Sequence, residues 1–383
     1  MGICGAFLTG DAFNLFVFFE VLLIASYGLM IHAGGARRFK AGVQYVIYNL
    51  LGSTLFLFAL GTLYAVTGTL NMADLAERAA QIPVDDSALL RVGAMLLFLV
   101  FAIKAALLPL HFWLPNTYAE APAPVAALFA VMTKVGAYAI LRFYTLVFGP
   151  DLDATAVLID RFLLYGALLS LAVGMIGVLG ARRLGRLAAF AAIGSMGTLL
   201  VAVAGFTEAS SAAALYYAIH STLAGALLFL VVDLVRERRG ALAGALVPGP
   251  RLAQHGIVTA LWFGAAIATA GMPPLSGFVG KLLILDATRD LADVWVIWAM
   301  ILATSLVAIV GLSQAGSVVF WKTDREAEAE GPTPALPLVA CFSLLGGVVA
   351  LAVFAGPVMR YIEATAAQLH APAAYIAAVL GQG

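Results

Sequence analysis

Ten long apolar segments constrain the fold of this chain more than any other feature of the sequence. Each is continuous and about 20 residues long or longer, which is the length that a helix needs to cross the hydrocarbon core of a membrane. Charged residues make up only 11% of the chain and hydrophobic residues 63%, against about 25% and about 45–50% in soluble domains. Such a surface requires lipid as its solvent. Because spanning backbone must satisfy its own polar groups, and because these runs do not alternate, they favour helices over a barrel.

We therefore predict an all-α membrane protein of about ten transmembrane helices joined by short connections. The predicted spans cover roughly 7–31, 41–67, 88–112, 123–147, 159–179, 186–206, 212–235, 256–287, 294–320 and 335–359.

The Lys and Arg residues of the loops predict the orientation of the chain. One set of alternate loops carries twelve basic residues and the opposite set carries four. Since cytoplasmic loops carry the excess of basic residues, the first set is predicted to be cytoplasmic in a bacterial inner membrane, with the C-terminus outside. The basic set comprises Arg37, Arg38, Lys40, Arg182, Arg183, Arg186, Arg236, Arg238, Arg239, Arg251, Lys322 and Arg325.

Four ionisable side chains stand deep inside the predicted spans, namely Glu20, Lys104, Lys134 and Lys281. A charge at the bilayer centre costs about 2.5–3.5 kcal/mol on insertion scales. These groups must therefore pair, lose their charge or face water. The lysines could also extend to the membrane surface, and a Glu–Lys pair could be purely structural. The functional interpretation is a proton path, since a buried lysine loses its charge readily.

Prolines interrupt two of the spans close to these lysines. Pro109 and Pro115 follow Lys104 in the third span, and Pro273 and Pro274 precede Lys281 in the eighth. Proline removes a backbone donor, and inside a membrane such a break is tolerated only where it is buried or lines a cavity. Two broken helices at matching places in two halves point to a transport site.

The two breaks also predict an internal repeat. They lie five spans apart, so two five-helix units would have inverted topology. The division is 1–158 for a first repeat, 159–321 for a second repeat, and 322–383 for a cytoplasmic loop, a final span and a tail. The first repeat lacks its opening helix, which suggests a shortened N-terminus.

Other residues carry weaker signals. His220, in the seventh span, could be a packing residue or a proton relay, since its ordinary pKa near 6.5 suits proton exchange. Asp11 fits an N-cap, and Gly174, Gly177 and Gly180 favour close helix packing. The sequence shows no nucleotide-binding, metal-ligand or redox motif, so we predict no cofactor and no enzymatic active site.

Four motifs carry a family resemblance. They are FLTGDAFNLFVFFEVLLIASYGLM around Glu20, HFWLPNTYAEAPAPVAALFAVMTKVGAYAI through Lys134, IHSTLAGALLFLVVDL at His220 and GMPPLSGFVGKLLIL at Lys281. Together they resemble the antiporter-like family, which comprises the proton-pumping subunits of respiratory complex I and their relatives in Mrp-type antiporters. The first motif and Lys281 favour similarity to the D-type subunits of the Mrp-type monovalent cation/proton antiporters.

The resemblance implies a role for each buried group. Glu20 and Lys104 would form the pair of a first channel, Lys134 a bridge, His220 part of a central hydrophilic axis, and Lys281 the end of a second channel. The chain would act with other membrane subunits, exchanging protons for sodium or another monovalent cation. Family members usually have fourteen spans, so the first three and most of the fourth would be missing here.

Two alternatives stay open at this point. The chain could be a pump subunit of a redox complex, such as complex I or a membrane-bound hydrogenase. It could also be a scaffold that transports nothing, in which the buried charges only specify helix packing.

Overall fold

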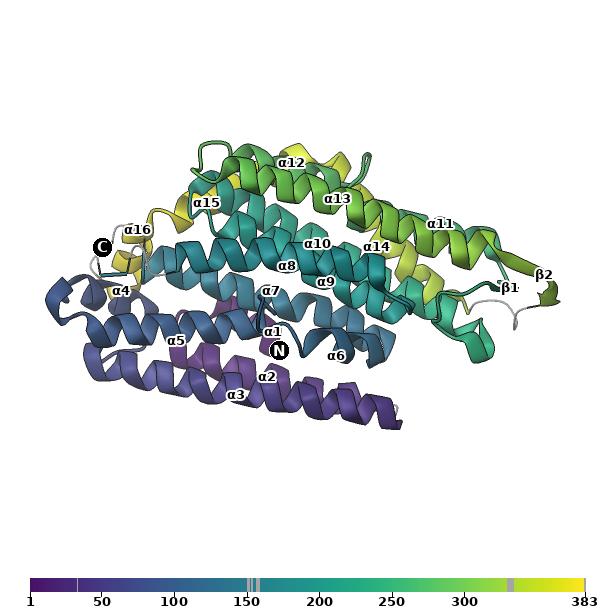
Figure 1. Cartoon of the computed structure of the whole chain (residues 1–383). Coiled ribbons are helices and arrows are strands. Elements are labelled where there is room, and N and C mark those ends of the chain that lie inside the picture. The colour runs from purple at the N-terminus through teal and green to yellow at the C-terminus, as the bar shows by residue number, and fades with distance from the viewer. Residues whose placement is uncertain (33, 150–151, 153, 156–158, 329–333, 382–383) are drawn as a thin grey trace.

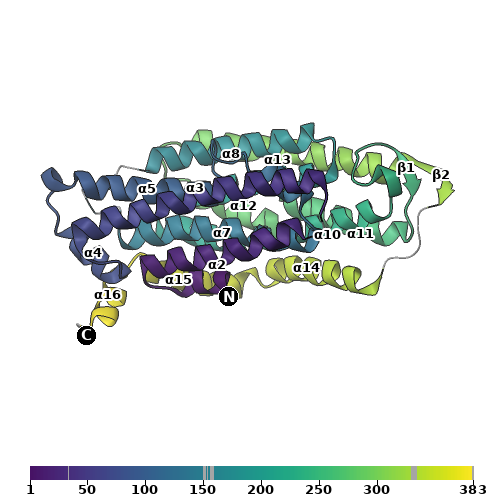
Figure 2. The ribbon, with the colours of Figure 1, turned by 90° about the horizontal axis from the view of Figure 1, so that it is seen from below.

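The protein is an elongated bundle of helices that run roughly parallel to its long axis (Figures 1 and 2). The computed structural model describes residues 1–32, 34–149, 152, 154–155, 159–328 and 334–381, with backbone alone at 324–328. The first part of the chain forms α1 (Gly2–Leu8), α2 (Ala12–Ile31), α3 (Ala36–Thr67), α4 (Met72–Ala80), the 3-10 turn η1 (Val84–Asp86), α5 (Ala88–Lys104), α6 (Leu114–Glu120) and α7 (Ala123–Leu146).

The second part begins with α8 and contains the central helix of the bundle, α10. It forms α8 (Asp160–Gly180), α9 (Leu184–Val203), α10 (Glu208–Glu237), η2 (Gly240–Leu242), β1 (Gly249–Arg251), α11 (His255–Ala270), α12 (Ser276–Ala287), α13 (Val294–Gly316), the π-helical turn η3 (Ser317–Trp321), β2 (Thr323–Glu328), α14 (Ala335–Val353), α15 (Ala355–Leu369) and α16 (Pro372–Leu380). Helix α10 is the central element, because it packs against α7, α9, α11, α12, α14 and α15.

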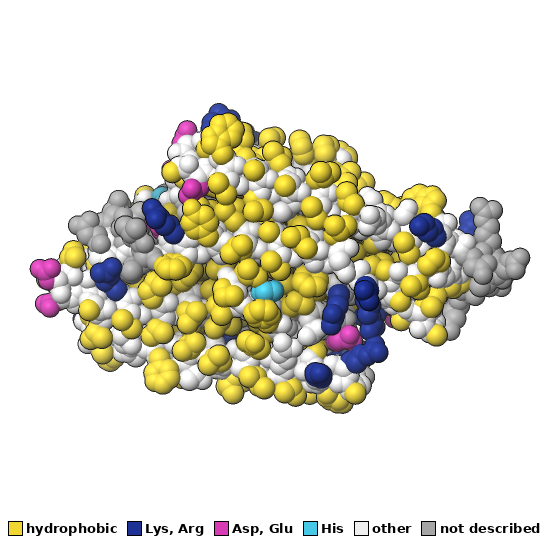
Figure 3. Space-filling view, in the orientation of Figure 1, with side chains coloured by type: hydrophobic (Ala, Val, Ile, Leu, Met, Phe, Trp, Pro, Cys, Tyr) yellow, Lys and Arg dark blue, Asp and Glu magenta, His cyan; other side chains and the backbone are white. Residues whose placement is uncertain are grey.

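The predicted fold class, an all-α membrane protein, is confirmed. Eight described helices are long and apolar enough to cross a membrane: α2, α3, α7, α8, α9, α10, α13 with η3, and α14. The other two predicted spans are the interrupted ones. The span at 256–287 is built from α11 and α12 with a turn between them, and the span at 88–112 comprises α5 and the turn that leads to α6. The face of the molecule seen in Figure 3 is correspondingly rich in apolar side chains.

Three details differ from the prediction. The first span begins at Ala12, because Asp11 caps α2 by accepting a hydrogen bond from the backbone N–H of Asn14 at 2.8 Å. The tenth span ends at Val353, and α15 continues after Phe354 and packs against α10. The sequence also did not predict the short parallel pair of β1 and β2 at one end of the bundle.

All four basic loops gather at that same end. Arg183 and Ala245 form an isolated antiparallel bridge between the loop after α8 and the loop after α10. The β1–β2 pair joins the loop after α10 to the loop after α13. Arg38, in the first turn of α3, donates from Nε to the backbone carbonyl of Glu120 at 2.8 Å. The sorting of basic loops onto one side, on which the predicted orientation depends, is therefore present in the fold.

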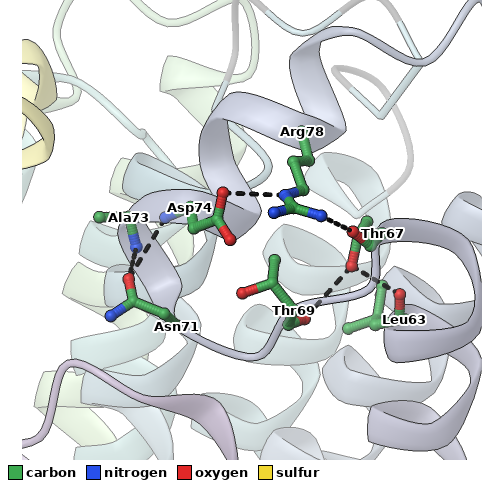
Figure 4. Close-up of polar contacts among 7 residues, drawn as sticks. All are labelled: Leu63, Thr67, Thr69, Asn71, Ala73, Asp74 and Arg78. Carbon is green, nitrogen blue, oxygen red and sulfur yellow. Dashed lines mark hydrogen bonds and ion pairs between the residues drawn. The ribbon is translucent and has the colours of Figure 1, made fainter. Parts of the chain in front are cut away.

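A hydrogen-bonded turn closes the opposite end between α3 and α4 (Figure 4). Asn71 caps α4, and its Oδ1 accepts from the backbone N–H groups of Ala73 at 3.0 Å and Asp74 at 3.3 Å. Arg78 joins Asp74 by an ion pair of 2.9 Å and donates to the backbone carbonyl of Thr67, also at 2.9 Å. These bonds satisfy backbone groups that the ends of the two helices leave free.

Close approach of backbones holds α8 against α9. A Cβ atom added at Gly174 would lie 2.2 Å from the backbone nitrogen of Gly194, and one at Gly177 would lie 2.3 Å from the ring of Phe190. The predicted packing role is therefore seen at these two positions. It was wrong for Gly180, where a Cβ would meet nothing within 4 Å.

Gly174→Ala is expected to destabilise the protein, because the methyl group would collide with the backbone of α9. Overpacking of this kind costs about 1–3 kcal/mol. Gly180→Ala, in the same helix, is the matched control and should be neutral or slightly stabilising, since alanine favours helix over glycine. Thermal unfolding of the purified variants checks this, and equal midpoints would show that the contact does not matter.

Candidate functional site

Glu20 lies in the middle of α2 and is partly buried against α3. Its carboxylate accepts a hydrogen bond from the hydroxyl of Ser53. The side chains of Phe19 and Ser53 around it are buried, with 1% and 5% of their surface exposed. A carboxylate at this depth needs such a donor, because an unpaired charge in an apolar interior is costly.

Lys104 is the last residue of α5, and 5% of it is exposed. Its Nζ donates to both the backbone oxygen and the side-chain oxygen of Asn49 on α3, each at 3.3 Å. The amine also lies 5.9 Å from the centre of the Phe19 ring, within cation–π range. A cation is favourable at this place, because the C-terminus of a helix carries partial negative charge.

Glu20 and Lys104 are linked through α3 rather than by direct contact. The two ion pairs of the described residues are Arg78–Asp74 and Arg289–Asp286, so the expected Glu20–Lys104 pair is not a direct salt bridge. Asn49, which binds Lys104, and Ser53, which binds Glu20, stand one turn apart on the same face of α3. Glu20 and Lys104 are therefore held by the same face of α3.

The first break follows directly after Lys104. The chain turns through Pro109 and resumes as α6, where Pro115 occupies the first turn, a position that needs no backbone donor. The freed backbone groups find side-chain partners inside the bundle. Ser170 accepts from the N–H of Leu108 at 2.8 Å, and the indole of Trp113 donates to the carbonyl of Ile103 at 3.1 Å.

Lys134 lies in the interior of α7 with 5% of its surface exposed. It faces a cavity of about 20 Å³ that is also lined by Ser195, Tyr217, His220 and Thr269. Its side chain thus shares a polar interior with groups from α9, α10 and α11. No hydrogen bond joins Lys104 to Lys134 in the described part of the chain. The two segments are close, however, because Gly136 on α7 packs against the backbone of the first break.

His220 connects α10 to the second break. Its Nδ1 lies 2.9 Å from the hydroxyl of Ser276, the first residue of α12, and the other side of its ring lies against Gly277. The ring is 2% exposed, and it lines the same small cavity as Lys134. His220 therefore lies between Lys134 and the start of α12, the helix that carries Lys281.

Lys281 lies on α12 and reaches back to the end of α11. Its Nζ donates to the carbonyl of Ala270, the last residue of α11, at 2.8 Å and to the hydroxyl of Ser305 on α13 at 2.7 Å. Gly271 makes room for this contact. It adopts a positive φ of 75°, and a Cβ there would lie 2.7 Å from Cδ of Lys281. The turn between the two helices contains Pro273 and Pro274.

The structure therefore brings the predicted site residues together in two groups. The first group is Glu20 with Lys104, and the second is Lys134, His220 and Lys281. Sequence reasoning missed the neutral polar residues that surround them, namely Asn49, Ser53, Ser195, Tyr217, Ser276 and Ser305. Among the described residues no group of three His, Cys, Asp or Glu side chains could hold a metal ion.

Comparison with known proteins decides the family. A sequence profile described as NADH:quinone oxidoreductase/Mrp antiporter, TM, matches residues 9–308. The chain belongs to this family. The predicted resemblance is thereby confirmed, and the family name covers both the expected antiporter subunit and the redox-complex alternative.

Relatives within the NADH:quinone oxidoreductase/Mrp antiporter family cover nearly the whole chain. It is 39% identical to the D-type subunit of a probable K(+)/H(+) antiporter of Rhizobium meliloti, over 99% of this chain and 75% of that protein. It is 36% identical to the D-type subunit of the Na(+)/H(+) antiporter of Alkalihalophilus pseudofirmus, over 99% of this chain and 76% of that protein. The chain thus spans about three quarters of the length of these relatives.

Solved structures of the family share the fold. A chain of the Mrp complex from Dietzia superposes with a TM-score of 0.85 at 27% identity, covering 99% of this chain and 78% of that chain. A chain of the archaeal membrane-bound sulfane sulfur reductase gives 0.88 at 26% identity, covering 98% and 75%. One from respiratory complex I of Thermus thermophilus gives 0.80 at 25% identity, covering 94% and 76%.

Ser53→Ala is expected to lower the thermal stability of the protein, because it leaves the Glu20 carboxylate without its hydrogen-bond donor. Losing a partner of a buried polar group costs about 1–3 kcal/mol and more when that group is charged. Thr54→Ala removes a neighbouring exposed hydroxyl that bonds within its own helix, to the carbonyl of Leu50. Thermal midpoints of the two variants should differ clearly; a Ser53→Ala midpoint as high as that of Thr54→Ala would contradict this account of Glu20.

Proposed function

We propose that this chain is the ion-translocating subunit of a multi-subunit monovalent cation/proton antiporter in a bacterial cell membrane. The names of its relatives in Rhizobium meliloti and Alkalihalophilus pseudofirmus support an antiporter subunit rather than an enzyme. The partners would be other membrane subunits, and the transported species would be protons and a cation such as sodium.

One observation carries the proposal: five ionisable groups lie inside the bundle in two groups, and most of them contact neutral polar side chains there. The groups are Glu20, Lys104, Lys134, His220 and Lys281. Ionisable residues inside spans are rare and mark ion and proton pathways. Lys104 and Lys281 lie at the two helix interruptions, and His220 contacts the second, which matches the way in which transporters of inverted-repeat type build their sites.

The first group would control proton entry. Protonation of Glu20 would remove a negative charge from the face of α3 that also holds Lys104. A proton would then leave the ammonium group of Lys104. The proton would next pass toward Lys134.

The second group would carry the proton onward through the small cavity. A volume of about 20 Å³ holds about one water molecule, and Lys134, Ser195, Tyr217, His220 and Thr269 would give that water its partners. A proton would leave the ammonium group of Lys134, cross this water to His220 and continue to Lys281.

The helix interruptions would allow Lys281 to gain and lose its proton as the charge around it changes. The carbonyl of Ala270 accepts a hydrogen bond from the ammonium group of Lys281. Ser305 brings no negative charge, and its hydroxyl can bond to either the charged or the neutral amine. Moving one charge across the membrane is worth about 2.3 kcal/mol per 100 mV, so the membrane potential could drive such a relay. Pro109, Pro115, Pro273 and Pro274 would serve as the structural elements that maintain the two breaks.

The same proposal includes the division of the chain into repeats. Residues 1–158 would form the first repeat, although this boundary falls outside the described residues, and 159–321 would form the second. The interruptions of α5 and α11 at corresponding places support this division. Residues 322–383 would add a cytoplasmic loop, the final span α14 and a tail. With the gathered basic loops facing the cytoplasm, the C-terminus would lie outside.

Lys281→Ala is expected to abolish pH-dependent cation exchange in inverted membrane vesicles, because no other amine of the described residues contacts Ala270 and Ser305. Lys322→Ala is the matched control, since Lys322 is exposed at the basic end of the bundle, away from the five groups. Size-exclusion chromatography of each variant establishes that its complex assembles. Full exchange by an assembled Lys281→Ala complex would refute the assigned role.

The likeness to complex I and to the sulfane sulfur reductase favours one alternative, a proton-pumping subunit of a redox-driven complex. Purification of the complex from native membranes separates the two. We expect small membrane subunits to accompany the chain, whereas flavin or iron–sulfur subunits in stoichiometric amount would favour the redox alternative.

A further inference from the structure

The basic end of the bundle contains a large cavity outside the proposed proton path. We propose that this cavity binds the phosphate group of an anionic phospholipid. It has a volume of about 520 Å³ and lies where the start of α3, helix α6 and the loop between α8 and α9 meet. Figure 3 shows the basic side chains gathered over α6 and the adjoining end of α3.

The charge of this cavity is one-sided. Its wall carries the basic residues Arg37, Lys40, Arg182, Arg183 and Arg186, with Glu120 as the single acidic lining residue. Such an excess of positive charge at the mouth of a cavity concentrates anions and repels cations. A cation is therefore an unsuitable ligand here, and an anion is a suitable one.

The basic side chains of the cavity wall are also free to bind an anion. The ion pairs of the described chain lie elsewhere, at Arg78–Asp74 and Arg289–Asp286, so no described carboxylate forms a salt bridge with them. Arg186 donates one N–H to the side-chain oxygen of Asn116 at 3.0 Å, which fixes its guanidinium at the cavity wall.

Helix α9 adds a second, independent attraction for an anion. It begins beside the cavity at Leu184, and it has no acidic residue in its first turn. Its N-cap residue is Arg183, whose side chain accepts no capping hydrogen bond. The first N–H of the helix, that of Leu184, donates to the carbonyl of Gly244 at 2.7 Å, so the contribution of α9 to anion binding is the partial positive charge of its N-terminal end.

The surroundings identify the phosphate as that of a lipid rather than a free ion. The cavity lies at the ends of two predicted spans, α3 and α8, where lipid headgroups are located. Beside it, α3 exposes a stripe of apolar residues one turn apart, Phe39, Val43 and Ile47, which are 50%, 59% and 60% exposed. The last turns of α8 expose Ile176 and Leu179. A phospholipid with its headgroup in the cavity could lay its acyl chains on these two faces, as basic pockets between membrane helices permit.

The test uses the purified protein with its accompanying subunits, after exchange into a neutral detergent that removes lipid. Phosphatidylglycerol, phosphatidylcholine and inorganic phosphate are titrated separately, and binding is followed by the thermal midpoint and by native mass spectrometry. We expect phosphatidylglycerol to bind and raise the midpoint, and phosphatidylcholine or inorganic phosphate to do so far less.

Arg37→Gln/Arg182→Gln should weaken phosphatidylglycerol binding about 30-fold, since each basic residue near an anionic lipid contributes about 1 kcal/mol. Arg251→Gln/Lys322→Gln removes two exposed charges from the same end but outside the cavity, and should leave binding unchanged. Equal losses in the two double variants, or equal binding of phosphatidylcholine, would overturn the proposal. Binding of inorganic phosphate as strong as that of phosphatidylglycerol would overturn the assignment to a lipid.

Discussion

The hydrogen bond from Lys281 to the carbonyl of Ala270 shows the constraint on which the rest of this structure depends. Inside a membrane neither an open helix end nor an amine can rely on water. Here each satisfies the other, because the amine donates to a carbonyl that the end of α11 leaves free. The break supplies the acceptor that the buried lysine needs, and the lysine supplies the donor that the free carbonyl needs. Lys104, at the end of α5, finds its acceptors elsewhere, in the backbone and side-chain oxygens of Asn49 in the middle of α3.

Much of the fold could be predicted from the sequence because the membrane imposes simple rules. Long apolar runs become helices, and the proline pairs around 109–115 and at 273–274 ended helices where expected. The tenth span ended earlier than predicted, at Val353. Pro357 gives the physical reason, since proline is tolerated in the first turn of α15 but would have broken a continuous helix. The pairing of β1 with β2 could not be predicted, because it joins two loops that are far apart in the sequence.

The candidate site was only half predictable for a related reason. Charged residues in apolar spans are conspicuous, so Glu20, Lys104, Lys134 and Lys281 were identified from sequence alone. The polar residues around them are neutral serines, an asparagine and a tyrosine. Such residues are common in membrane helices and give no signal in the sequence. A pattern was available for one pair, because Asn49 and Ser53 are spaced by one turn and form a polar stripe on α3. The resemblance implied a Glu20–Lys104 pair, and α3 turns out to stand between the two groups.

Helix α10 runs from an acidic end of the bundle to a basic end. It begins at Glu208 beside a cavity that also carries Asp286 and Glu363, and it ends near Arg236, which shares a small pocket with Arg183 and Arg186. Its 30 residues span about 45 Å, more than the roughly 30 Å of a bilayer core. These two groups of charged residues make one end of the bundle acidic and the other basic, with His220 buried between them. The two ends are not equivalent for a cation: the acidic end attracts it, whereas the basic end repels it unless an anion is bound there. An asymmetry of this kind is built into the helix lengths and loop charges, and it would persist through every protonation state of the buried groups.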